Sequence, residues 1–223
     1  MVPSGPSHLR TYHRDVTAAS LVPELPFPLT SAHPQAWRVD QSAGCLVAVA
    51  PGHTDLYVNP GGAASADAES MLNAATLIGA APIGDFQFHA RVTVEFAAKY
   101  DAGVLLLWID DRHWAKFCFE YSPDEAPMVV SVVTRELSDD ANAFVVDGNS
   151  VWLRISRLDH AYAFHASTDG SRWSFVRTFA IGKDLADHMI GFEVQSPTGD
   201  GCTVTFDRIG FASTRLGDLR DGT

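Results

Sequence analysis

The 223-residue sequence has no long apolar run and little positive charge. No stretch approaches the roughly 18 consecutive apolar residues of a membrane-spanning helix, so we expect no membrane partner. Lys and Arg total 16 against 27 Asp and Glu, which gives a formal net charge of −11. Nucleic acids and anionic membranes are bound by positive surfaces, so we do not expect nucleic acid as a partner either.

Cysteine is also scarce. Cys45, Cys118 and Cys202 are far apart, and no Cys-x-x-Cys or Cys/His spacing typical of a metal site is present. We therefore predict three reduced thiols, no metal and no cofactor. Residues 1–16 lack the apolar segment of a secretory signal, so the sequence predicts a cytoplasmic protein.

Alternating apolar and polar residues dominate the rest of the chain. In "FQFHARVTVEF", residues 86–96, every second residue is Phe, Ala or Val, which predicts a half-buried strand. Similar strands are predicted at 103–109, 114–121, 128–134, 151–157, 161–167, 174–179, 190–196 and 202–211. The Asp169-Gly170 pair predicts a hairpin between two of them. Strands at this spacing are typical of an all-β sandwich or barrel.

The remaining segments show little pattern. Residues 60–75 are rich in Gly, Ala and Ser and predict a loop, and residues 183–188 are the one short helix candidate after residue 85. We expect a single β-sandwich domain over residues 21–212. An irregular N-terminal segment, 1–20, precedes it, and a C-terminal tail, 213–223, follows it and is expected to lie loosely on the surface.

Charged residues interrupt the apolar strand "WAKFCFEY", residues 114–121. Phe117 and Phe119 point to the core face, which sends Lys116 and Glu120 to the other face. Later strands share this mixed character, so we predict one ligand site on a concave sheet face, formed by Trp114, Lys116, Glu120, Trp152, Arg154, His165 and Glu193. A solvated face with weak ion pairs is the alternative. Trp108 falls on either face, depending on one residue of register.

The order of several motifs resembles the DUF1349 family, which is also named after a yeast protein linked to regulation of enolase. The matching pieces are "TDLYVNP" (54–60), "YDAGVLLLWIDDRHWAKFCFEY" (100–121), "VVTRELSD" (132–139), "VWLRISR" (151–157), "STDGSRW" (167–173) and "GFEVQSPTGDGCTVTFDRIGF" (191–211). The resemblance implies a concanavalin A-like lectin/glucanase fold, a two-sheet antiparallel jelly-roll sandwich of roughly a dozen strands.

The resemblance also extends to polar positions. It adds Thr54 and Asp55 as loop candidates for ligand binding, although Asp55 is equally suited to stabilising a turn. The family pattern has Ser-Asp-Trp after the Val-Thr strand, whereas Ser138 and Asp139 are followed here by Asp140.

Three classes of function fit this reading. We predict a non-catalytic intracellular binding module for a carbohydrate-like or other polyhydroxylated small molecule. A regulatory or scaffolding protein that acts on a protein partner is the alternative. A glycoside hydrolase is disfavoured, because the paired carboxylates of a Glu-x-Asp-x-x-Glu strand are missing. No Gly-x-Ser-x-Gly nucleophile motif is present either, so we assign no catalytic residue.

Overall fold

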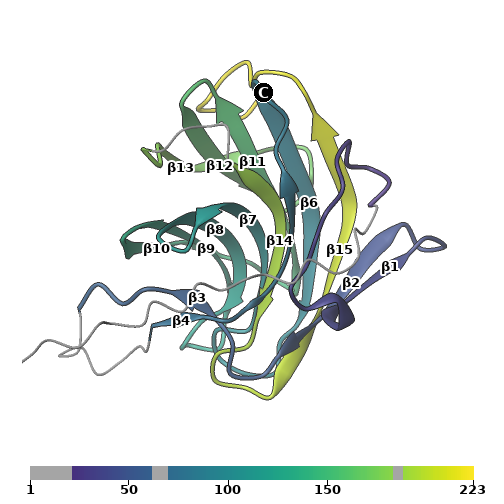
Figure 1. Ribbon diagram of the computed structural model, residues 1–223, viewed down its shortest axis with the longest axis vertical. Coiled ribbons are helices and arrows are strands. Elements are labelled where there is room, and N and C mark those ends of the chain that lie inside the picture. The colour runs from purple at the N-terminus through teal and green to yellow at the C-terminus, as the bar shows by residue number, and fades with distance from the viewer. Residues whose placement is uncertain (1–21, 62–69, 183–187) are drawn as a thin grey trace, which may run out of the picture.

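The computed structural model describes residues 22–61, 70–182 and 188–223. The predicted N-terminal segment and most of the predicted helix at 183–188 therefore lie outside the described residues. Two antiparallel sheets pack face to face, after a short 3-10 helix η1 (Pro34–Ala36) (Figure 1). The predicted all-β, two-sheet antiparallel sandwich is confirmed.

Seven strands form the larger sheet. In spatial order they are β1 (Trp37–Asp40), β2 (Cys45–Pro51), β15 (Gly201–Ala212), β6 (Phe86–Glu95), β11 (Ser150–Leu158), β12 (Ala161–Ser167) and β13 (Ser174–Phe179). The predicted turn at Asp169-Gly170 joins β12 to β13, and Gly170 adopts φ +74°, which glycine tolerates without a Cβ clash.

Six strands form the second sheet, and a hairpin lies on its outer side. The sheet order is β10 (Leu137–Val145), β9 (Pro127–Arg135), β8 (His113–Tyr121), β7 (Ala102–Asp110), β14 (Met189–Gln195) and β5 (Ala75–Ala80). The hairpin consists of β3 (Leu56–Tyr57) and β4 (Met71–Leu72). Most of the predicted loop at 60–75 lies outside the described residues, at 62–69, and the prediction is wrong at residues 71–72, which form β4.

The core lies between the two sheets and follows the predicted alternation. Phe117, Phe119, Val151, Leu153 and Ile155 are at most 1% exposed, as predicted. Phe117 of β8 stacks on Phe164 of β12, with ring centroids 4.5 Å apart and planes 11° apart. This aromatic pair joins the two sheets directly.

A second apolar cluster covers the outer face of the six-stranded sheet. Leu56 of the hairpin packs there with Leu106, Trp108 and Trp114. Trp108 pairs with Trp114 in the β7–β8 register, so Trp108 lies on the outer face rather than in the core. The hairpin is held against β10, because Ser138 and Val58 exchange two hydrogen bonds of 2.9 Å. The hairpin and this apolar cluster thus bury much of the outer face, and they surround the polar residues that lie on it.

The C-terminal tail packs firmly against the seven-stranded sheet, so the expectation of a loose tail is wrong. Leu216 is 2% exposed, and Arg215 forms ion pairs of 2.9 Å with Asp85 and Asp159. Burial of one leucine and several directed contacts hold a segment whose sequence shows no strand pattern.

No helix of the described residues has the length and hydropathy needed to cross a bilayer. No group of three or more His, Cys, Asp or Glu side chains among them is arranged to hold a metal ion.

Candidate ligand-binding cleft

A polar cleft of about 270 Å³ opens on the outer face of the six-stranded sheet. It is lined by Asp55, Tyr57, Met71, Tyr100, Lys116, Glu120, Val132, Asp140, Gln195, Pro197 and Thr198. A larger cavity of about 350 Å³ lies beside the β1–β2 turn, but its charged lining residues are only Glu24 and Asp40. The smaller cleft is the stronger candidate, because buried charge and hydrogen-bonding groups converge in it.

Lys116 forms the floor of the cleft. Strand alternation directs its side chain away from the core, yet the side chain is only 3% exposed. Its Nζ donates hydrogen bonds of 2.8 Å to Asp55 Oδ1 and of 2.8 Å to Gln195 Oε1. Burial alone lowers the pKa of Lys116, but the surrounding negative charges, with Asp55 foremost, outweigh burial and raise it. Lys116 is therefore a fixed ammonium group.

Two glutamic acids beside this ammonium are driven toward their neutral forms. Burial raises the pKa of Glu120 and of Glu193 to about 8, although Lys116 opposes the rise in both. Glu193 is 0% exposed, and neither of its carboxyl oxygens has a hydrogen-bond partner among the described residues. At neutral pH the two acids are largely protonated, so the Lys116–Asp55 pair is the main fixed charge of the floor.

The structure brings together part of the predicted site. Lys116, Glu120 and Asp55 line the cleft, and Glu193 lies beneath it on β14. Thr54 does not line the cleft, because its Oγ1 donates a 2.6 Å hydrogen bond to the carbonyl of Pro51 and stabilises the turn before β3.

The prediction that all seven residues share one face is wrong. Trp152 and Arg154 lie on β11 and His165 lies on β12, so these three belong to the seven-stranded sheet. The chain crosses from one sheet to the other between β10 and β11, and alternation does not reveal such a crossing. Trp114 shares the outer face with Lys116 but is 0% exposed beneath the second apolar cluster, so its ring is not open to a ligand.

Eight cleft residues were not predicted as site residues, and Tyr57, Tyr100, Asp140 and Gln195 are among them. Gln195 is detectable in principle, because it shares the period-two face of Glu193. Asp140 lies on the edge strand β10, and burial raises its pKa. Tyr57 and Tyr100 come from short or irregular segments, where no periodicity gives a signal.

The fold and the cleft define a class before any relative is considered. A two-sheet antiparallel sandwich with a polar cleft on one outer face is typical of lectin/glucanase-like domains. The chain belongs to the DUF1349 family, described as a protein of unknown function, whose profile matches residues 31–214.

One curated relative is the "Regulation of enolase protein 1" of Saccharomyces cerevisiae. It is 32% identical over 124 residues, which are 54% of this chain and 61% of the yeast protein. The matched region thus spans less than two thirds of the yeast protein.

Three solved structures share the fold. A functionally unknown protein from Saccharomyces cerevisiae superposes with a TM-score of 0.70 at 23% identity, over 83% of this chain and 96% of that chain. A xylan β-1,4-xylosidase from Bacillus halodurans superposes with a TM-score of 0.66 at 12% identity, over 94% of this chain and 41% of that chain. The carbohydrate-binding module CBM66 from Bacillus subtilis superposes with a TM-score of 0.51 at 13% identity, over 89% of this chain and 98% of that chain. These likenesses establish the fold.

Proposed function

We propose that this chain is a binding protein whose cleft takes a small carbohydrate-like or other polyhydroxylated molecule. The observation that carries the proposal is the buried Lys116 ammonium, held at 2.8 Å by both Asp55 and Gln195 on the cleft floor. The third N–H of this pre-oriented group and the neutral acid of Glu120 together offer donors and acceptors to the hydroxyls of a ligand.

The size and walls of the cleft support a small ligand. Its volume of about 270 Å³ is near the lower end of the range, about 300–1,000 Å³, that small-molecule sites occupy. Tyr57 and Tyr100 line it and offer ring faces to the apolar side of a sugar. The likeness to a carbohydrate-binding module supports the same ligand class as a fold-level analogy.

A calorimetric titration with D-xylose, D-glucose, D-fructose and myo-inositol tests the proposal. We expect at least one of these compounds to bind, and we expect Glu120→Ala to weaken its binding about tenfold, the effect of about 1.4 kcal/mol. The matched control is Glu95→Ala, because Glu95 is exposed on β6 of the other sheet. Glu120→Ala should leave the free energy of unfolding within about 1 kcal/mol of the parent.

Three results would count against a binding cleft. These are the absence of binding by all four compounds, equal effects of the two alanine variants, and a large loss of stability in Glu120→Ala. Release of 4-nitrophenol from aryl xylosides or glucosides would instead favour a hydrolase over a non-catalytic module.

A regulatory protein acting through protein contacts is the second candidate. The name of the yeast relative, which refers to regulation of enolase, favours it. Sedimentation velocity of the chain mixed with purified enolase tests this candidate, which predicts a faster-moving complex.

Free thiols at Cys45, Cys118 and Cys202 support the proposed cytoplasmic location, where thiols stay reduced.

A further inference from the structure

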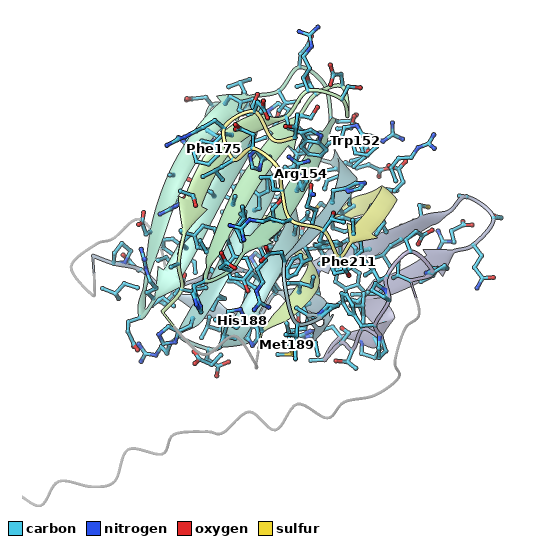
Figure 2. The ribbon with its side chains drawn as sticks, turned by 90° about the horizontal axis from the view of Figure 1, so that it is seen from above. Trp152, Arg154, Phe175, His188, Met189 and Phe211 are labelled. Atoms are coloured by element: carbon cyan, nitrogen blue, oxygen red, sulfur yellow. The ribbon has the colours of Figure 1, made fainter. Side chains whose placement is uncertain are left out.

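A row of three basic side chains crosses the outer face of the seven-stranded sheet, opposite the cleft. In the strand register, Arg154 of β11 pairs with His89 of β6 on one side and with His165 of β12 on the other. Arg154 is 6% exposed and His165 is 0% exposed. Residues 216–223, which we call the strap, lie over Arg154 and His165 of this row, and Figure 2 shows the C-terminal chain crossing beside Arg154 and Phe175.

The buried cation of this row has no acidic partner among the described residues. Arg154 donates from Nη2 to the carbonyl of Gly222 at 2.5 Å, while its Nε has no acceptor. His165 Nε2 lies 2.8 Å from the carbonyl of Leu219, and its Nδ1 has no partner. Burial lowers the pKa of Arg154 to about 10. Neutral peptide carbonyls thus occupy positions where a carboxylate would be bound more strongly.

The strap also carries the acid that acts on this row. Asp221 is exposed, and its charge opposes the effect of burial on the pKa of His165. Arg154, in contrast, lowers the pKa of His165 and of His89, in both cases after burial as the larger cause. Displacing the strap would remove Asp221 and uncover Arg154 and His165, with His89 next to Arg154 in the strand register.

Aromatic rings form the walls around the row. Arg154 lies over the ring of Trp173 at 4.2 Å, and His165 packs against Phe175 with centroids 5.7 Å apart. Trp152 lies beside His89 with centroids 6.1 Å apart. The Arg154 cation between aromatic walls suits a small molecule that carries a carboxylate on a ring.

We propose that the row His89–Arg154–His165 is a second binding site, for a small ring compound bearing a carboxylate, and that the strap competes with this ligand for Arg154. The site lies on the opposite face from the cleft and does not depend on the function proposed for the cleft. Because the two occupants exclude each other, each weakens the binding of the other by the same factor.

Gly222 provides the means to displace the strap while keeping the full chain. It adopts φ +77°, and a Cβ there would lie 2.7 Å from both Arg154 Nη2 and the Trp173 Cβ. Gly222→Val should therefore lift the strap. Gly148→Val is the matched control, because Gly148 also has a positive φ, +97°, but a Cβ there meets nothing within 4 Å.

The probes are glucuronate and glucose, which differ only in a carboxylate replacing a hydroxymethyl group. By calorimetry, we expect Gly222→Val to bind glucuronate about tenfold or more tightly than the parent, within the range of about 5–150-fold typical of coupled sites. Gly148→Val should bind glucuronate with the affinity of the parent, and Gly222→Val should bind glucose no more tightly than the parent does. Arg154→Leu in the Gly222→Val background should abolish the increase in affinity for glucuronate. In the parent, saturating glucuronate should speed tryptic cleavage after Arg220, read by mass spectrometry as loss of Asp-Gly-Thr.

The proposal is overturned if Gly222→Val binds glucuronate no more tightly than the parent although faster tryptic cleavage shows that its strap is free. It is equally overturned if Gly222→Val increases the affinity for glucose as much as the affinity for glucuronate. The same holds if the increase persists when Arg154→Leu is added and circular dichroism shows that the double variant is folded. Binding of the neutral compounds in the cleft assay is unaffected by any of these outcomes, so the two proposals fail separately.

Discussion

Single residues on strand β8 explain why charges interrupt an apolar run. Lys116 and Glu120 both point to an outer face that the β3–β4 hairpin partly covers, so they are neither core nor solvated surface. One ammonium group serves Asp55 and Gln195, which leaves Glu193 without a hydrogen-bond partner. A buried acid without partners destabilises the fold when it is ionised, and this gives the residue a measurable signature.

Glu193→Gln should stabilise the protein in a pH-dependent way. The pKa of Glu193 is about 8 in the folded state against an ordinary 4.5, so the folded state keeps a proton that the unfolded chain loses in this window. Stability therefore falls as pH rises from about 4.5 to 8, and the variant escapes that loss. We expect little difference near pH 4.5 and a gain of about 1–3 kcal/mol at pH 8.

Urea denaturation at both pH values measures this gain. Glu95→Gln is the control, because Glu95 is exposed and its substitution should change stability by less than about 0.5 kcal/mol at either pH. A gain of the same size at pH 4.5 and pH 8 would show that ionisation of Glu193 is not the cause.

At the scale of the element, strands with clear alternation were predictable, including the edge strand β13, whereas β2, β5 and β10 were not predicted. Strand β6 alternates over its whole length between buried and half-exposed residues, which is the pattern that sequence reading detects. Strand β10 is an edge strand whose residues are mostly exposed, so no apolar alternation marks it. Strand β5 is buried on both faces through residue 79, so its sequence shows no alternation of apolar and polar residues.

The same limit explains how much of the site could be foreseen. Alternation assigned Lys116, Glu120 and Arg154 correctly to outward faces, but it does not say to which sheet a strand belongs. That depends on β11 pairing with β6 and β12, a set of contacts between residues far apart in the chain. Tyr57 and Tyr100 line the cleft but lie outside the long strands, so no periodic pattern predicts them as site residues.

Gly191 holds strands β14 and β5 at close approach. A Cβ at this position would lie 2.1 Å from the carbonyl oxygen of Leu77, a backbone atom that no rotamer change can move. We expect Gly191→Ala to destabilise the protein by about 1–3 kcal/mol, the usual cost of overpacking, and to speed hydrogen exchange in β5. Gly148→Ala is the open-space control and should leave exchange in β5 unchanged. Unchanged exchange in both variants would mean that β5 does not depend on this contact.

The whole molecule presents two outer faces of opposite character. The six-stranded sheet holds an acidic cleft around one ammonium group, and the seven-stranded sheet holds a basic row beneath the strap. Between them lies a continuous apolar core that includes the Phe117–Phe164 stack. Two sites separated by such a core can be occupied independently, provided that the core does not transmit strain from one sheet to the other.

Independence of the faces predicts that their mutations add. Glu193→Gln acts on one outer face and Gly222→Val on the other, so the double variant should match the sum of the single changes in unfolding free energy within about 0.5 kcal/mol. Glu193→Gln combined with Lys116→Met is the comparison, because the Lys116 charge acts directly on Glu193. That neighbouring pair should deviate from additivity by about 0.5–3 kcal/mol. Urea denaturation at pH 8 measures both cycles. A deviation above about 1 kcal/mol across the faces would mean that the sheets are mechanically coupled, and occupancy of one site would then alter affinity at the other.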